Sequence, residues 1–311
     1  MFMPELPEVH TTVTGLQKVL PGLVIRDVWT DLAKKNQKIK HFRGTLKEEK
    51  FYKYFKKTVS GAKVISAERR AKNILINLSN GQTILIHLKM TGHLLFGKYK
   101  KQNSTWVPDQ SEKNQALRDP YNRFVHVAFT LSNGKHLVFS DARKFGKVTL
   151  LPTKTAHETI HLKGIGPEPL DKTFSEAIMI ECLLKKPSGK IKQVLMDQSV
   201  IAGIGNIYSD EMLWLAGIHP LSRVEKIPPA KMSSLYKGMR EVLKKGIDFG
   251  GDSMSDYRNI HGKRGEFQHK HNVYQLRGKL CKKHGCKGVI TRIVIGSRSA
   301  HFCPIHQKLY N

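Results

Sequence analysis

The chain has 311 residues, of which 40% are hydrophobic and 25% charged, the composition of a folded protein large enough for two domains. Lys and Arg number 53 against 25 Asp and Glu, so the formal net charge is +28. Such an excess repels itself in a compact fold and predicts a polyanionic partner, with a generally solvated basic surface as the plainer alternative. Nucleic acid is favoured over an anionic membrane, because the sequence has neither a basic amphipathic helix nor a lipidation motif.

Membrane insertion and secretion are not expected. No apolar run approaches the ~18 residues needed to cross a bilayer, and the N-terminus has no signal-peptide core. Cys182 stands alone in a helical stretch and is predicted to be a core residue, whereas the other three cysteines cluster near the C-terminus. This distribution favours a reducing compartment and one metal site over a disulfide scaffold.

The first half of the chain predicts a helix followed by antiparallel strands. Apolar residues recur at helical spacing after Pro7 until Pro21-Gly22 ends the run. Two pairs of apolar runs, each around an Asn-Gly turn, predict hairpins at 73–88 and 125–140 and hence an antiparallel sandwich or barrel. The polar, aperiodic stretch 98–119 is predicted to be a surface loop.

The second half predicts helices, at 174–185, 191–198, 206–216 and 229–249. The glycine-rich, polar stretch 250–268 is predicted to be a mobile loop. The expected fold class is therefore α+β. Its expected parts are an N-terminal β-sandwich domain (4–150), a linker (151–172), a helical domain (173–268) and a zinc finger (273–311).

Cys281-x4-Cys286 and Cys303-x2-His306 form two pairs of metal ligands, separated by a stretch that can form a hairpin. Zn²⁺ prefers four nitrogen or sulfur ligands in a tetrahedron, and four protein ligands leave no open position. The pattern predicts one structural Zn²⁺. His284 in place of Cys286 is the alternative ligand, and ordinary buried thiols are the alternative without a metal.

A glycine turn at Gly203-Ile204-Gly205-Asn206 precedes a predicted helix. Glycine permits a positive φ and close approach of another backbone. Asn206 is predicted to cap the helix, whose N-terminus favours an anion such as a DNA phosphate. The turn alone is a weak signal, because many such turns only cap a helix. No strand precedes it, which argues against a dinucleotide-binding fingerprint.

Taken together, these features resemble the formamidopyrimidine-DNA glycosylase family over residues 4–307. The motifs that carry the resemblance are Met3-Pro4-Glu5-Leu6-Pro7-Glu8, Arg69-Arg70-Ala71-Lys72, His87-Leu88-Lys89-Met90-Thr91-Gly92, Asp141-Ala142-Arg143-Lys144-Phe145-Gly146, Gly203–Tyr208 and Arg298–Gln307. The resemblance implies a helix–two-turn–helix domain ending in a zinc finger. It also implies a monomeric base-excision repair enzyme of the bacterial cytoplasm or nucleoid. Such an enzyme flips 8-oxoguanine or a ring-opened purine out of double-stranded DNA, removes it and cuts the strand by β,δ-elimination.

The resemblance also implies catalytic roles. As the N-terminal residue, Pro4 would carry a free secondary amine that attacks C1′ and forms a Schiff base. Glu5 would move protons at the opening sugar ring, Glu8 would orient the site, and Lys72 would transfer a proton near the base. Arg298 would grip a phosphate and assist δ-elimination. Without the family, the two glutamates would only suit a helix N-terminus and the lysine would be one of many solvated ones.

Further residues match DNA contacts of the family. Met90, Arg143 and Phe145 would fill the hole that the flipped base leaves, with the guanidinium pairing to the orphaned cytosine. The plainer alternative for Met90 and Phe145 is that they are core residues at strand ends. The other matches are Asn206, Lys192, His126 and, in the loop that closes over the flipped base, Tyr257.

One departure from the family concerns the nucleophile. Met1-Phe2 precede Met3-Pro4, so the free amine requires a start at Met3 followed by methionine removal. Two alternatives remain open. An oxidised-pyrimidine enzyme resembling endonuclease VIII is disfavoured by the Glu5-Leu6-Pro7 start and by Arg143 with Phe145, and a zinc-dependent DNA-binding protein without catalysis would follow from a blocked N-terminus.

Overall fold

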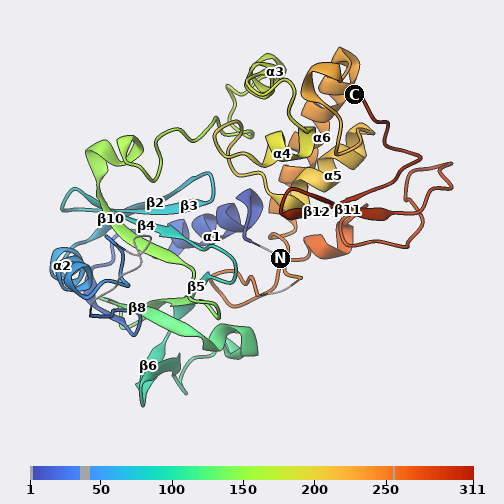
Figure 1. The fold of residues 1–311 in the computed structure, drawn as a ribbon. Helices are drawn as coiled ribbons and strands as arrows, with labels where there is room; N and C mark the ends of the chain where they lie inside the picture. The colour runs from blue at the N-terminus through green and yellow to red at the C-terminus, as the bar shows by residue number, and fades with distance from the viewer. Residues whose placement is uncertain (1–2, 36–42, 255) are drawn as a thin grey trace. The chain divides into compact units, whose positions relative to one another are not determined.

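The computed structural model describes residues 3–35, 43–254 and 256–311 (Figure 1). The chain forms two compact units. The first contains Glu8–Lys163 and Gly250–Gly265 together with the residues up to Pro4, and the second contains Glu5–Pro7, Gly164–Phe249 and Glu266–Asn311. No helix in the described ranges is long and apolar enough to cross a membrane.

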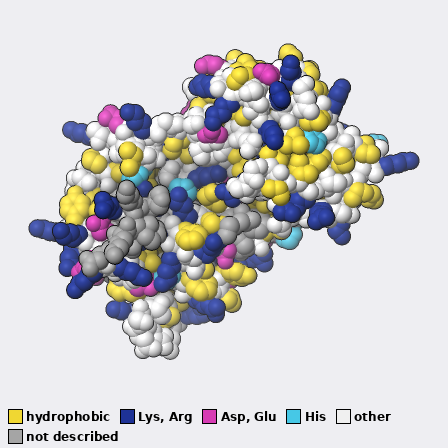
Figure 2. Space-filling model, in the orientation of Figure 1, with side chains coloured by type: hydrophobic (Ala, Val, Ile, Leu, Met, Phe, Trp, Pro, Cys, Tyr) yellow, Lys and Arg dark blue, Asp and Glu magenta, His cyan; other side chains and the backbone are white. Residues whose placement is uncertain are grey.

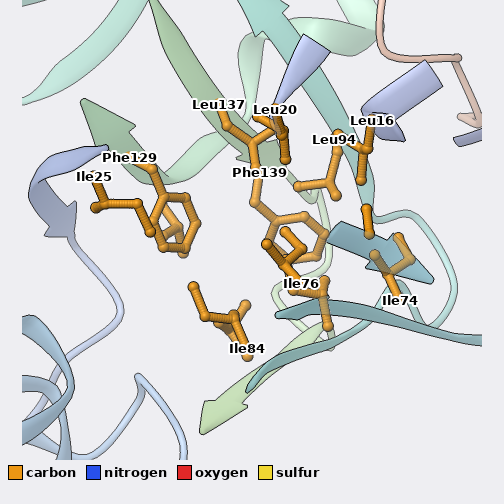
Figure 3. Close-up of a cluster of buried hydrophobic side chains, with 14 of the residues drawn as sticks. Leu16, Leu20, Ile25, Ile74, Ile76, Ile84, Leu94, Phe129, Leu137 and Phe139 are labelled. Atoms are coloured by element: carbon orange, nitrogen blue, oxygen red, sulfur yellow. The ribbon is translucent and has the colours of Figure 1, made fainter. Parts of the chain in front are cut away.

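The first unit is built on two four-stranded antiparallel sheets. One has the order β1 (Ile25–Thr30), β8 (Val125–Leu131), β9 (His136–Ser140), β5 (His93–Gly97). The other has the order β10 (Lys147–Pro152), β4 (Gln82–His87), β3 (Asn73–Leu78), β2 (Val64–Arg70). Their apolar side chains share one core with α1 (Leu6–Val19) and α2 (Glu49–Val59), and Leu16, Ile76, Ile84 and Phe139 belong to it (Figure 3). The predicted antiparallel sandwich with an N-terminal helix is confirmed.

Both predicted hairpins form around their Asn-Gly turns. β3 pairs with β4 and β8 pairs with β9. Gly81 and Gly134 each adopt a φ of 75°, which a side chain would strain. The turn glycines therefore fix the register that sends the apolar faces of these strands into the core.

The stretch 98–119, predicted to be a surface loop, contains regular structure that was not predicted. β6 (Tyr99–Gln102) and β7 (Thr105–Pro108) form a short hairpin, followed by 3₁₀ turns at Gln115–Arg118 and Pro120–Arg123. Trp106 packs on the His136 ring with the ring centroids 4.7 Å apart, which attaches the hairpin to the sheet. Strands of four residues are too short to show a periodicity, and their anchor is a long-range aromatic contact.

The predicted mobile loop is tied to the rest of the first unit through most of its length. Arg258 is buried and forms an ion pair with Asp119, with Nε 3.1 Å from Oδ2. The carbonyl of Ile260 accepts a hydrogen bond of 2.8 Å from the Phe96 amide. Met254, by contrast, is 37% exposed. An ion pair and backbone hydrogen bonds hold this polar segment in place. Composition alone does not distinguish such a segment from a mobile loop.

The second unit contains the predicted helices, α3 (Glu176–Leu184), α4 (Ile191–Met196), α5 (Asn206–Ala216) and α6 (Pro229–Asp248). Shorter 3₁₀ turns lie at Val224–Lys226 and Phe267–Lys270, and another, Thr153–Glu158, follows β10 in the first unit. The chain ends in an antiparallel hairpin of β11 (Thr291–Ile295) and β12 (Arg298–Phe302). The prediction of a helical second part that ends in a β-hairpin is confirmed.

His93, buried in the first unit, makes acid destabilisation an expected property of the fold. Burial lowers the pKa of His93 to about 4 and outweighs its hydrogen bonds to Asn122 and the Thr91 carbonyl. The unfolded chain binds a proton near pH 6.5, so the stability of the fold should fall as the pH drops from 6.5 towards 4, by up to ~1.4 kcal/mol per pH unit. Urea unfolding at several pH values should show that the free energy of unfolding depends less steeply on pH in His93→Gln than in the parent protein. The same change at the exposed His269 should leave the slope as in the parent, and equal slopes for both variants would contradict the assignment.

Candidate functional site

The Glu5 carboxylate lies at the N-terminus of α5, within the second unit. Its oxygens accept the backbone N–H groups of Ile207 at 2.9 Å and Tyr208 at 3.4 Å. Gly205 makes room for it, because a Cβ there would lie 2.3 Å from the Glu5 carboxyl carbon. Glu5 is only 2% exposed, so the helix dipole and two amides hold a buried carboxylate in one position.

The predicted capping role of Asn206 is wrong. Asn206 is the first residue of α5, and the N-cap is Gly205 without a side-chain hydrogen bond. The Asn206 side chain instead donates to the Tyr274 hydroxyl at 3.3 Å. The glycine turn does contact another backbone segment and an anion, but both belong to this chain. The Leu6 amide donates to Gly203 O at 3.0 Å, and the anion is the Glu5 carboxylate. The sequence indicated an anion here without indicating that it is the chain's own.

Two further acidic residues of α5 organise the second unit, and no role was predicted for them. Asp210 is buried and accepts from Lys192 and from the backbone N–H of His301 at 2.8 Å. Glu211 is buried as well and accepts the backbone N–H groups of 272–274 at 2.8–3.1 Å. Adjacent acidic residues inside a helix of low polarity were the available signal. Buried charges of this kind persist only when paired and hydrogen-bonded.

Lys192 and Arg298 lie in the same part of the second unit. They line one hollow of about 280 Å³, whose other lining residues are Gln193, Met196, Asp197, Ile295 and Ser297. Lys192 is 1% exposed and engaged with Asp210, so its ammonium joins α4 to α5. Arg298 begins β12 and is only partly buried. Of the two, Arg298 is better placed to reach a phosphate, and the DNA contact of Lys192 stays a prediction.

In the first unit, Glu8 fixes the loop that contains Tyr257. A Glu8 carboxylate oxygen accepts the Asp252 amide at 2.7 Å, and the Tyr257 hydroxyl donates to the Glu8 carbonyl at 2.9 Å. Burial raises the pKa of Tyr257, which therefore stays protonated as a donor. Pro4, also assigned to this unit, is buried. Glu8 and Tyr257 thus attach this loop to the first helix, and the role of Glu8 in orienting the site stays a prediction.

Lys72, Lys89 and Lys147 all lie near His87, also in the first unit. Lys72 is buried in the turn between β2 and β3, directly after Ala71 at a φ of 52°. His87 on β4 lies opposite Lys147 on β10, and burial together with nearby lysines (Lys89, Lys72 and Lys147) lowers its pKa to about 3. Burial and Lys89 lower the pKa of Lys147 to about 8. Among these residues the sequence predicted a role for Lys72 alone, through the family motif. A bound anion would reduce the electrostatic repulsion between the lysines.

Met90, Arg143 and Phe145 come together in the first unit, as predicted. Arg143 Nη1 lies 3.3 Å from the sulfur of Met90, and its guanidinium lies 4.6 Å from the centre of the Phe145 ring. Phe145 is 45% exposed, which is unusual for a large apolar side chain. The buried Asp141 supports the loop by accepting from the Thr91 hydroxyl and, at 2.6 Å, from the Gly146 amide. The reading of Phe145 as a core residue is excluded.

His126 is held within the first unit. Its Nδ1 lies 2.9 Å from both carboxylate oxygens of Asp31, and the side chain is largely buried. A DNA contact by His126 stays a prediction. On the face shown in Figure 2, Lys and Arg side chains are far more frequent than acidic ones, as the composition requires.

The predicted metal cysteines converge in the second unit. The sulfur atoms of Cys281, Cys286 and Cys303 lie within 4.8 Å of one another. The Gly288 amide donates to Cys286 Sγ at 3.4 Å and lowers the pKa of that thiol, whereas burial raises the pKa of Cys303 to about 11. Three convergent soft donors fit Zn²⁺. Within the described residues the cluster does not include His306, whose Nε2 lies 2.7 Å from the Trp214 carbonyl oxygen.

Comparisons with known proteins agree with these observations. The model of the formamidopyrimidine-DNA glycosylase N-terminal domain matches residues 3–148, and that of the formamidopyrimidine-DNA glycosylase H2TH domain matches 165–258. A formamidopyrimidine-DNA glycosylase of Pelotomaculum thermopropionicum is 36% identical over 99% of this chain and 100% of its own. That of Chloroflexus aurantiacus is 38% identical over 98% of each chain.

Among solved structures, a complex of Lactococcus lactis Fpg with DNA containing an abasic site matches with a TM-score of 0.81 at 28% identity. The match covers 98% of this chain and 99% of that one. MutM in complex with DNA containing carbocyclic 8-oxo-G matches with a TM-score of 0.79, also at 28% identity, over 98% and 100% of the two chains. The two domain models, the full-length relatives and the shared fold lead to one conclusion: the chain belongs to the formamidopyrimidine-DNA glycosylase family.

Proposed function

We propose that this protein is a bifunctional DNA glycosylase and abasic-site lyase that removes oxidised purines from double-stranded DNA in base excision repair. The observation that carries the proposal is Glu5, the neighbour of Pro4, held as a buried carboxylate by the N-terminus of α5. Full-length similarity to enzymes of this name, and to proteins solved with abasic-site and 8-oxo-G DNA, supports the substrate class.

The chemistry begins at Pro4, whose secondary amine is free only when no residue precedes it. The amine forms a bond to C1′ of the flipped nucleotide while the bond from C1′ to the base breaks, and the base leaves with the electron pair and takes up a proton. The Glu5 carboxylate takes up the proton that the Pro4 nitrogen loses on forming this bond and passes it to O4′ as the C1′–O4′ bond opens, which leaves an iminium. The iminium acidifies the C2′ proton, whose loss expels the 3′ phosphate, and a second elimination expels the 5′ phosphate.

The other candidate residues support this sequence of steps. Glu8 orients the site, Lys72 transfers a proton near the leaving base, and Arg298 holds a phosphate during δ-elimination. Met90, Arg143 and Phe145 occupy the duplex after flipping, and the exposure of Phe145 supports this role. Asn206, Lys192, Tyr257 and His126 are proposed to support DNA binding, with Lys192 and Tyr257 acting through the elements that they anchor.

We further propose one structural Zn²⁺, held by Cys281, Cys286, Cys303 and His306. The metal would cross-link the terminal hairpin, a contribution to folding rather than to catalysis. The proposed division of the chain stays at 4–150, 151–172, 173–268 and 273–311, with the exceptions that 250–265 packs with the first part and 5–7 with the helical part. A monomer in the bacterial cytoplasm or nucleoid fits the bacterial origin of the relatives.

A lesion panel tests the proposed specificity. Duplexes with a single 8-oxoguanine, a ring-opened guanine, a 5-hydroxyuracil or no lesion are incubated with the protein under single-turnover conditions. We expect fast strand cleavage at both purine lesions, slow cleavage at the oxidised pyrimidine and none in undamaged DNA. Preference for 5-hydroxyuracil would instead indicate an enzyme of the endonuclease VIII type. Binding without cleavage by a chain that begins at Pro4 would indicate a DNA-binding protein.

A further inference from the structure

The C-terminal end of α5 touches the cysteine cluster through Trp214. The indole Nε1–H of Trp214 donates a hydrogen bond to Cys281 Sγ at 3.3 Å. Both residues are buried in one apolar cluster with Cys303. An N–H aimed at a ligand sulfur fixes the orientation of that sulfur and would offset the charge that the sulfur carries when it binds a metal.

The main chain of Trp214 holds a second predicted ligand. His306 Nε2 lies 2.7 Å from the Trp214 carbonyl oxygen, and the two rings pack edge to face at 5.2 Å. A carbonyl oxygen can only accept, so Nε2 carries the proton and Nδ1 keeps its lone pair. The Trp214 carbonyl oxygen also accepts the Gly217 amide at 3.1 Å, and its second lone pair is available to His306. The contact therefore selects the tautomer in which Nδ1 can bind a metal.

Further hydrogen bonds join the C-terminal end of α5 to the segment that carries Cys303 and His306. Trp214 is followed by Gly217, whose φ of 67° ends the helix, and the chain after His306 returns to this end through the Lys308 amide on Gly217 O (3.0 Å). The Gln307 side chain adds a 2.8 Å bond to Ile218 O. The end of α5 and the segment that carries Cys303 and His306 are thus joined by several hydrogen bonds.

We propose that Trp214 is a positioning residue of the metal site: its indole N–H orients the Cys281 sulfur, and its carbonyl oxygen keeps His306 in the tautomer whose Nδ1 is open to the metal as a fourth ligand. The inference rests on the proposed structural metal and not on the proposed excision chemistry. It assigns to α5 two functions at opposite ends, since Glu5 occupies the N-terminus and the metal ligands occupy the C-terminus.

Trp214→Phe tests the indole contact, because it keeps an aromatic ring and removes the N–H. The full-length variant, stripped of metal and titrated with Co²⁺, should bind 10–100-fold more weakly than the parent, the usual cost of losing a partner of a metal ligand. Its thiolate-to-cobalt charge-transfer band should move to longer wavelength, since an uncompensated sulfur gives up electron density more easily. Trp106→Phe is the matched control: Trp106 lies in the first unit, and its Nε1 has no hydrogen-bond partner within the described residues.

Weaker binding with an unshifted band would mean that Trp214 only packs, and unchanged binding would mean that the contact is irrelevant; either result overturns the proposal. Imidazole ¹⁵N NMR of the zinc-loaded parent protein tests the second contact without any substitution. We expect a protonated Nε2 and a metal-bound Nδ1 on His306, and the reverse assignment overturns the proposal. A parent protein that binds no Co²⁺ would refute both this inference and the metal proposal, while the lesion panel would still report on excision.

Discussion

Glu5→Gln is expected to lower the single-turnover rate of 8-oxoguanine excision by roughly 10²–10⁴-fold, the range typical for loss of a general acid–base group. Glutamine retains an oxygen that can accept the Ile207 amide, so the N-terminus of α5 should keep its structure. It has no proton to give to the sugar oxygen. The affinity for DNA with an abasic-site analogue, measured by fluorescence anisotropy, should change little because the DNA-contacting side chains are untouched.

Glu8→Gln is the matched control, the same chemical change three residues further along the chain. The Glu8 carboxylate accepts the Asp252 amide, a role that the amide oxygen of glutamine can fill. We therefore expect a smaller loss of rate than at Glu5. A Glu5→Gln protein that excises the base as fast as the parent would show that this carboxylate only caps the helix.

Cys303→Ala is expected to abolish metal binding and to loosen the terminal hairpin. Structural zinc contributes an apparent binding free energy of about 10–16 kcal/mol in small zinc domains, and this free energy stabilises the fold around the metal. Cys303 lies 3.7 Å from Cys286, sulfur to sulfur, and its own sulfur accepts the His306 amide, so its removal affects the whole cluster. Atomic-emission analysis should show about one zinc per parent chain and none in the variant, with weaker binding to duplex DNA.

Cys182→Ala supplies the control for this experiment. Cys182 is buried on α3, outside the three-cysteine cluster. The variant should keep its zinc and its affinity for DNA, and lose only the stability that a small cavity costs. Undiminished zinc in Cys303→Ala would contradict the proposed ligand set.

The elements with strong local signals could be predicted from the sequence. α5 begins at Asn206 and ends at Ala216 as expected, because glycines bracket an unbroken helical run. The β3–β4 and β8–β9 hairpins follow from apolar runs around Asn-Gly turns. The β6–β7 hairpin was missed because its strands are short, and the anchoring of Arg258 by Asp119 was missed because the two residues are far apart in sequence.

The candidate site was predictable in its residues more than in its geometry. Motif resemblance selected Glu5, Arg143 and Phe145, but not what holds them in place. Neither the occupation of the α5 N-terminus by Glu5 nor the contact of Thr91 with Asp141 can be read from spacing, since both depend on packing between distant segments. Lys192 shows the same limit, because a basic residue in a basic protein gives no sign that it is buried against Asp210.

The claim that the Pro4 nitrogen is the nucleophile is tested most directly by borohydride trapping. Protein whose intact mass shows Pro4 as the first residue is mixed with a duplex containing 8-oxoguanine opposite cytosine, reduced, and digested for peptide mapping. We expect a covalent protein–DNA adduct with the sugar attached to Pro4. A correctly processed chain that gives no adduct, or one attached at Lys72, would contradict the account.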